Sequence, residues 1–151
     1  MTTALDTGGT RNEILNGVLM FFKDAAPFKT VTRQMKLFSD VPNVQRPWLG
    51  ILKTGEERSY EGNMPLLIID VELFIYTQAI IVNNGGTPPS QQLEDILDTV
   101  DKQMKPDPFT NRQTMGGLVY HCRIEGKTVT VPGDLDGDGI MIIPLKILIP
   151  S

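Results

Sequence analysis

The chain has 151 residues, 40% hydrophobic and 21% charged, which fits one globular domain large enough to bury its own core. Its single cysteine excludes an intrachain disulfide, and with it a disulfide-stapled secreted module. The net charge of −4 argues against a dedicated nucleic-acid binder and against a polybasic membrane-surface protein. We therefore expect a cytoplasmic, single-domain protein.

The N-terminal residues carry no recognisable targeting pattern. Residues 1–9 are small, polar and glycine-containing, without the basic and apolar regions of a signal peptide, so we expect a flexible arm. The most apolar stretch, residues 65–82, is interrupted by Asp70 and Glu72 and is rich in β-branched and aromatic side chains. It predicts a long strand rather than a membrane-spanning helix.

The first predicted element is a helix over residues 11–23. Thr10 and Glu13 have the spacing of a capping box, in which each side chain satisfies a free amide at the helix start. Within the helix, apolar residues recur at helical spacing on one face, at Ile14, Leu15, Val18, Leu19 and Phe22. Pro27 marks the exit from the helix.

The next segments predict three strands. Alternating side chains over residues 31–37 indicate a half-buried antiparallel strand, followed by a proline-containing loop at 39–47. Residues 48–53 predict a second strand that ends in a turn at 54–57. Residues 66–77 predict the central strand, because every second side chain is apolar: Leu67, Ile69, Val71, Leu73 and Ile75.

The second half predicts one helix and then strands. Residues 90–105 have helical spacing of apolar side chains, with acids early and lysines late, as the helix dipole favours. Strands follow at residues 118–125, 128–131 and 140–149, with a loop at 133–139. The order predicts an α+β fold over residues 1–151. We expect a mostly antiparallel or mixed sheet packed on two main helices, with a β-hairpin near the C-terminus.

One acidic loop resembles a calcium-binding motif. Asp134, Asp136 and Asp138 occupy the first, third and fifth positions of an EF-hand loop, with glycine at the sixth. The twelfth position, which needs a bidentate glutamate, is Leu145, and the flanks predict strands instead of helices. We favour a hairpin turn over a metal site, and expect no metal and no cofactor.

Asp70 and Glu72 lie on one side of the same predicted strand and allow a carboxylate pair of the kind that glycosidases use. No other element offers a partner for such chemistry. We favour an open sheet face or a subunit contact for these two acids.

The other candidates for chemistry are isolated residues. His121 and Cys122 are adjacent in a predicted strand, so they point to opposite faces and cannot form a local base–nucleophile dyad. We expect Cys122 in the core and His121 at the surface or at an interface. Arg46 and Trp48 fit either an exposed cation–aromatic contact or, for the tryptophan, a core position. We therefore expect no catalytic residues and no enzyme.

Three segments together resemble the tail terminator proteins of long-tailed bacteriophages. Residues 113–126 are similar to a family segment reading Gln-Thr-Leu-Gly-Gly-Leu-Val before a strand that ends in Glu-Gly, with Met115 in place of leucine. Residues 133–147 are similar to the family's acidic hairpin and its terminal Ile-Pro-Val-Lys-Ile strand, and residues 70–76 to its central strand. The likeness extends over residues 14–150.

The resemblance implies a non-enzymatic virion protein. Such a protein forms a homohexameric ring on the head-proximal end of the tail tube, stops tube polymerisation and joins the tail to head-completion or neck proteins. A contractile tail adds a sheath partner, and DNA passes through the ring without sequence-specific binding. Expected locations are the host cytoplasm during assembly and the tail or neck of the virion. Alternatives are another neck or connector adaptor, or a calcium-dependent hydrolase that uses Asp134, Asp136 and Asp138.

Charge is distributed unevenly along the chain. Residues 1–62 have a net charge of +1 and residues 63–151 a net charge of −5, which favours head-to-tail association of copies. The acidic loop is a candidate lining for the lumen of such a ring, because carboxylates repel the phosphates of passing DNA. The candidate interface or lumen residues are Asp134, Asp136, Asp138, Asp70, Glu72, Arg46, Trp48 and His121.

Overall fold

The structure is a computed structural model that describes residues 10–24, 28–77, 88–132 and 139–150. The predicted arm at residues 1–9 lies outside this part of the chain, as do residues 133–138 with Asp134, Asp136 and Asp138.

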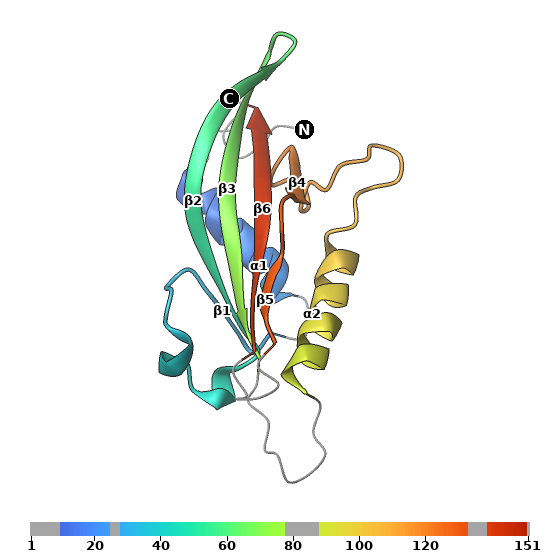
Figure 1. The fold of residues 1–151 in the computed structure, drawn as a ribbon. Helices are drawn as coiled ribbons and strands as arrows, with labels where there is room; N and C mark the ends of the chain where they lie inside the picture. The colour runs from blue at the N-terminus through green and yellow to red at the C-terminus, as the bar shows by residue number, and fades with distance from the viewer. Residues whose placement is uncertain (1–9, 25–27, 78–87, 133–138, 151) are drawn as a thin grey trace.

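A six-stranded mixed sheet forms the centre of the fold, in the order β1-β2-β3-β6-β4, with β5 also paired to β6. Among the described strands, only β1 and β2 run parallel, and the other pairs are antiparallel. Helix α1 crosses behind the sheet and α2 lies beside the β4 and β5 edge (Figure 1). This confirms the predicted α+β fold. The elements are α1 Arg11–Lys23, β1 Thr30–Thr32, η1 Phe38–Asp40, η2 Asn43–Gln45, β2 Trp48–Glu61, β3 Met64–Tyr76, α2 Pro89–Gln103, β4 His121–Ile124, β5 Val129–Val131 and β6 Ile140–Pro150.

Helix α1 begins and ends where its sequence predicts. The Thr10 hydroxyl accepts a hydrogen bond from the Glu13 amide at 3.2 Å, which caps the first turn. Gly17 lets the helix lie close to Leu118, since a Cβ at that position would come within 2.6 Å of the leucine side chain. The face carrying Ile14, Leu15, Val18 and Phe22 is buried.

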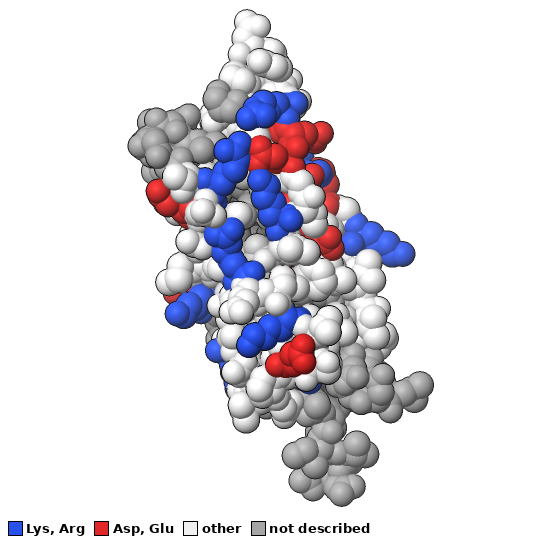
Figure 2. All heavy atoms as spheres, turned by 90° about the vertical axis from the view of Figure 1, so that its left-hand side faces the viewer, with Lys and Arg blue, Asp and Glu red and all other residues white. Residues whose placement is uncertain are grey.

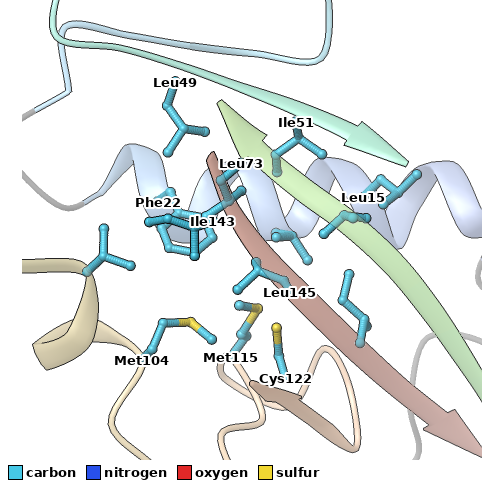
Figure 3. Close-up of a cluster of buried hydrophobic side chains, with 14 of the residues drawn as sticks. Leu15, Phe22, Leu49, Ile51, Leu73, Met104, Met115, Cys122, Ile143 and Leu145 are labelled. Carbon is cyan, nitrogen blue, oxygen red and sulfur yellow. The ribbon is translucent and has the colours of Figure 1, made fainter. Parts of the chain in front are cut away.

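The main core lies between this helix face and the sheet. The five apolar residues predicted for the central strand are all buried, each 1% exposed or less. Helix α2 completes the core with Leu93, Ile96 and Val100. Side chains from both helices, the central strands and the 113–122 segment converge there (Figure 3), among them Leu15, Phe22, Leu73, Met104, Met115, Cys122 and Leu145. Packing on one sheet face thus joins both helices to strands β2, β3, β4 and β6.

The strand predicted at residues 31–37 is wrong in length and direction. Strand β1 spans only Thr30–Thr32 and runs parallel to β2. The Thr32 hydroxyl accepts a hydrogen bond from the Gln34 amide at 2.9 Å and turns the chain there. Leu37, at the end of the predicted strand, is 72% exposed.

The turn predicted at residues 54–57 is also wrong. Strand β2 continues through it to Glu61, with a β-bulge between Lys53 and Gly55. The bulge shifts the register, so that Glu56 lies opposite Ile69 and faces the α1 side of the sheet. The reversal of the chain comes later, where Gly62 has a φ of +61°.

The strand predicted at residues 118–125 is shorter than expected, because β4 begins only at His121. A turn precedes it, with positive φ at Met115, Gly116 and Gly117. The carbonyl of Thr114 accepts hydrogen bonds from the amides of Gly117 and Val119 and holds this turn closed.

Candidate interaction surfaces

Arg46 and Trp48 belong to a small second cluster on the sheet face opposite the main core. Trp48 is 1% exposed and stacks on Tyr76, with ring centroids 4.6 Å apart. Arg46 is 6% exposed, lies 3.7 Å above the Phe38 ring and donates to the carbonyls of Phe38 and Val41. The core position for Trp48 is confirmed, and the exposed cation–aromatic contact is wrong. Both residues are buried within one protomer, so neither offers a surface to another chain.

Asp70 and Glu72 lie on the same open side of β3, as predicted. Asp70 accepts a hydrogen bond from the Lys146 ammonium of β6 at 2.7 Å, and this contact raises the pKa of Lys146. Asp70 and Lys146 are direct cross-strand neighbours, and such opposite-charge pairs stabilise a sheet modestly. This arrangement fits the open sheet face that we favoured over catalytic acids.

His121 and Cys122 point to opposite faces of β4. Cys122 is fully buried in the core, and burial raises its thiol pKa to about 12, so it is a poor nucleophile. His121 is half-buried, and its Nδ1 accepts a hydrogen bond from the Gln113 amide at 3.0 Å. Burial, with Arg123 and Arg112 nearby, lowers the pKa of His121. The histidine therefore acts as a neutral acceptor that fixes the segment before β4.

A groove of about 370 Å³ runs between the C-terminal end of α2 and β4. Its lining includes His121 and Arg123 of the strand, Asp101 of the helix and Lys105 just after it. The mixed charges and open shape suit a protein contact better than an enclosed small-molecule pocket. The lining residues are Asp101, Met104, Lys105, Pro106, Asn111, His121, Cys122, Arg123 and Ile124.

Charged side chains join α1 to β2 on the opposite side of the molecule. Glu56 accepts from the Arg11 guanidinium at 2.8 and 2.9 Å and also from the Lys53 ammonium. These hydrogen bonds, the one from Arg11 first, lower the pKa of Glu56 to about 2. Arg33 donates to Asn12 and Asn16 of α1. Figure 2 shows lysine and arginine side chains gathered down this side, with acidic residues among them.

Two exposed aromatic side chains were missed from the sequence. Phe109 is 95% exposed in the loop after α2, and Tyr60 is 71% exposed near the end of β2. For Phe109 the available signal was an aromatic residue inside a polar, proline-containing segment, and for Tyr60 an aromatic residue among the polar residues 54–63. Exposed aromatic residues of this kind are typical anchors of protein interfaces.

Within the described residues, no three His, Cys, Asp or Glu side chains are grouped to hold a metal ion. No helix in the same part of the chain is long and apolar enough to cross a membrane. Comparison with protein-family models gave no match, and comparison with curated proteins gave none either.

Proposed function

We propose that the protein is a tail terminator of a long-tailed bacteriophage or a related particle. It assembles as a homohexameric ring at the head-proximal end of the tail tube, ends tube polymerisation and joins the tail to the head or neck. Its partners are further copies of itself, the tail tube protein and a head-completion or neck protein. A contractile tail adds the sheath protein.

The observation that carries this proposal is the arrangement of the three segments with family resemblance. Residues 70–76 lie in β3, residues 121–124 form β4, and residues 140–147 lie in β6. These strands are consecutive in the sheet, in the order β3-β6-β4, and Cys122 pairs with Ile147. Segments far apart in the sequence thus form one structural unit. This adjacency supports a common origin of the chain and the tail terminator family, rather than three unrelated short matches.

The exposed surfaces also fit a protein that works through contacts. The β2–β3 hairpin extends past the rest of the sheet (Figure 1), and residues 58–63 at its end are exposed. The loop after α2, which carries Phe109, lies beyond the β4 edge of the sheet (Figure 1), beside the groove between α2 and β4. Surfaces on several sides suit a ring subunit that must contact two neighbours, the tube and the neck.

The test measures the length distribution of tails by electron microscopy, in a lysate of host cells that produce particles lacking this protein. We expect overlong tails that do not join heads, because polymerisation has no terminator. Purified protein added to polymerising tube subunits should restore a fixed length. Complementation with the wild-type chain is the control.

Tails of normal length that join heads normally would contradict the assignment. Tails of normal length that fail to join heads would instead indicate a neck adaptor. The two outcomes separate the proposed function from its nearest alternative.

A further inference from the structure

We propose that the hydrogen bond between His121 and Gln113 is a pH-sensitive latch. When His121 takes up a proton, the latch opens and loosens the loop at residues 106–112, which carries the exposed Phe109 and borders the groove between α2 and β4. A partner that binds there meets a formed surface near neutral pH and a loosened one in acid. The latch is a property of the free chain and can be tested without tails.

Gln113 closes the base of this loop, which leaves the end of α2 at Lys105 and returns at Gln113. The Gln113 side-chain amide donates to the carbonyls of Gln103 and Lys105 at 3.1 and 2.9 Å, and its Oε1 accepts from the Met115 amide at 2.9 Å. The Gln113 backbone carbonyl accepts from the Cys122 amide at 2.9 Å. One residue therefore ties the helix end, the loop and β4 together.

His121 holds the backbone amide of Gln113, and it can do so only as a neutral ring. Its Nδ1 accepts the Gln113 N–H at 3.0 Å. A backbone amide can only donate, so Nδ1 must present its lone pair and the ring proton must lie on Nε2. Protonated histidine carries a hydrogen on both nitrogens, which would bring two N–H groups together and break the bond. Histidine is the side chain whose ordinary pKa puts this change between about pH 5 and pH 8.

The charges around His121 also oppose its protonation. Burial first, and then Arg123 and Arg112, lower the pKa of His121. Tyr120 and Cys122, which adjoin His121 in the chain, are neutral at and below about pH 7. The charged groups around the latch, four of them cations and two of them acids, are Arg112 of the loop, Asp101 of α2, Lys105 just after it, Arg123 of β4, Glu125 just after β4 and Lys146 of β6. A proton on His121 therefore adds a further cation to a mainly cationic neighbourhood, which favours opening of the latch over a new ion pair.

The titration of His121 and the opening of the loop are linked quantitatively. A His121 pKa below its ordinary value of 6.5 means that the closed state binds the proton more weakly than the open state. Well above pH 6.5 both states are neutral, and the latch stays closed. As the pH falls through 6.5 toward the lower pKa of the closed state, the open state gains, by about tenfold in the opening equilibrium for each pKa unit between the two states.

The experiment measures hydrogen exchange of the backbone amides of Asp107, Gln113 and Cys122 by NMR, from about pH 8 to about pH 4. Each rate is compared with the intrinsic rate of that amide at the same pH, and amides of β3 serve as the internal reference. His121 is the only histidine of the chain, so its own pKa is measured in the same sample. We expect the three amides to lose protection as His121 titrates, about tenfold for each unit of its lowered pKa, while β3 stays protected.

Two substitutions of His121 separate the proton from the hydrogen bond. His121→Asn places an amide oxygen near the position of Nδ1 and takes up no proton, so protection of the loop should no longer depend on pH. His121→Phe keeps a ring of similar size without an acceptor, so the three amides should be about tenfold less protected already at neutral pH. Circular dichroism checks that both variants fold.

Unchanged protection of the three amides while His121 titrates would overturn the latch. A pH dependence of the wild-type size in His121→Asn would also overturn it, because carboxylates would then be responsible. Full wild-type protection in His121→Phe would show that the hydrogen bond does not hold the loop. The tail-length experiment tests the proposed function separately from all three outcomes.

Discussion

The ionisation of Glu56 is coupled to the packing of α1 on β2. Its carboxylate is 23% exposed and bound by Arg11 of the helix and by Lys53 of the strand. Because both partners are cations, the folded state holds the ionised form and lowers its pKa from 4.5 to about 2. A lowered carboxyl pKa contributes stability above the unfolded value, and that stability is lost as the pH falls toward the folded value.

We expect Glu56→Gln to reduce the free energy of unfolding by about 1 kcal/mol at pH 7, since exposed charge pairs are screened by solvent. The difference between wild type and variant should shrink as the pH falls from about 4.5 to about 2. Urea denaturation across this range measures it. Glu57→Gln, on the exposed neighbouring residue, should have little effect at either pH. A difference that stays constant with pH would assign the effect to lost packing instead.

The residue scale also shows how far sequence alone can predict a site. The opposite orientation of His121 and Cys122, and the common side of Asp70 and Glu72, follow from strand periodicity and are correct. The partner of Glu56 could not be predicted, because Arg11 lies forty-five residues away in the sequence. Glu56 faces Arg11 only because the bulge between Lys53 and Gly55 shifts the register of β2. The burial of Arg46 depends on carbonyls supplied by a folded loop, which no periodicity indicates.

At the scale of elements, the central strand β3 has the clearest division between its two faces. Its residues alternate between the main core and the open face, so adjacent positions have opposite environments. Val71 is 1% exposed beneath the helices, and Glu72 beside it is partly exposed on the other face.

Val71→Asp should bury an unpaired charge in the core and reduce the free energy of unfolding by about 3 to 5 kcal/mol. Thermal or urea unfolding followed by circular dichroism checks this. Glu72→Ala is the matched control on the adjacent residue, and we expect a change below about 1 kcal/mol there. Similar stability of Val71→Asp and the wild type would reverse the assignment of the two strand faces.

Elements with strong local patterns were predictable, and those decided by tertiary contacts were not. Helices α1 and α2 and strands β3 and β6 have long apolar periodicities, and the structure confirms them. The polar residues 54–57 suggest a turn when taken alone, yet they pair with β3 because that strand offers a long partner. Parallel pairing of β1 with β2 depends on contacts far along the chain, so the alternation at residues 31–37 is misleading.

At the scale of the whole molecule, the two apolar clusters share the same strands. The main core joins both helices to one face of β2, β3 and β6. The small cluster covers the other face at the end of the sheet, where Trp48 and Tyr76 pack with Phe38 from the 33–47 segment. Trp48 in β2 and Tyr76 in β3 are direct cross-strand partners. Loss of either cluster therefore disturbs strands that the other needs.

We expect the chain to unfold in one cooperative step, with coincident transitions from two probes. Trp48 is the only tryptophan, so its fluorescence reports the small cluster, whereas far-ultraviolet circular dichroism reports the helices and the sheet. Phe38→Ala should weaken the contacts with Tyr76 and Arg46 and shift both transitions together to lower denaturant. A fluorescence transition that precedes the circular dichroism transition would mean that the 33–47 segment separates first. The small cluster would then be a local cover on the sheet, and one free energy of unfolding would not describe the molecule.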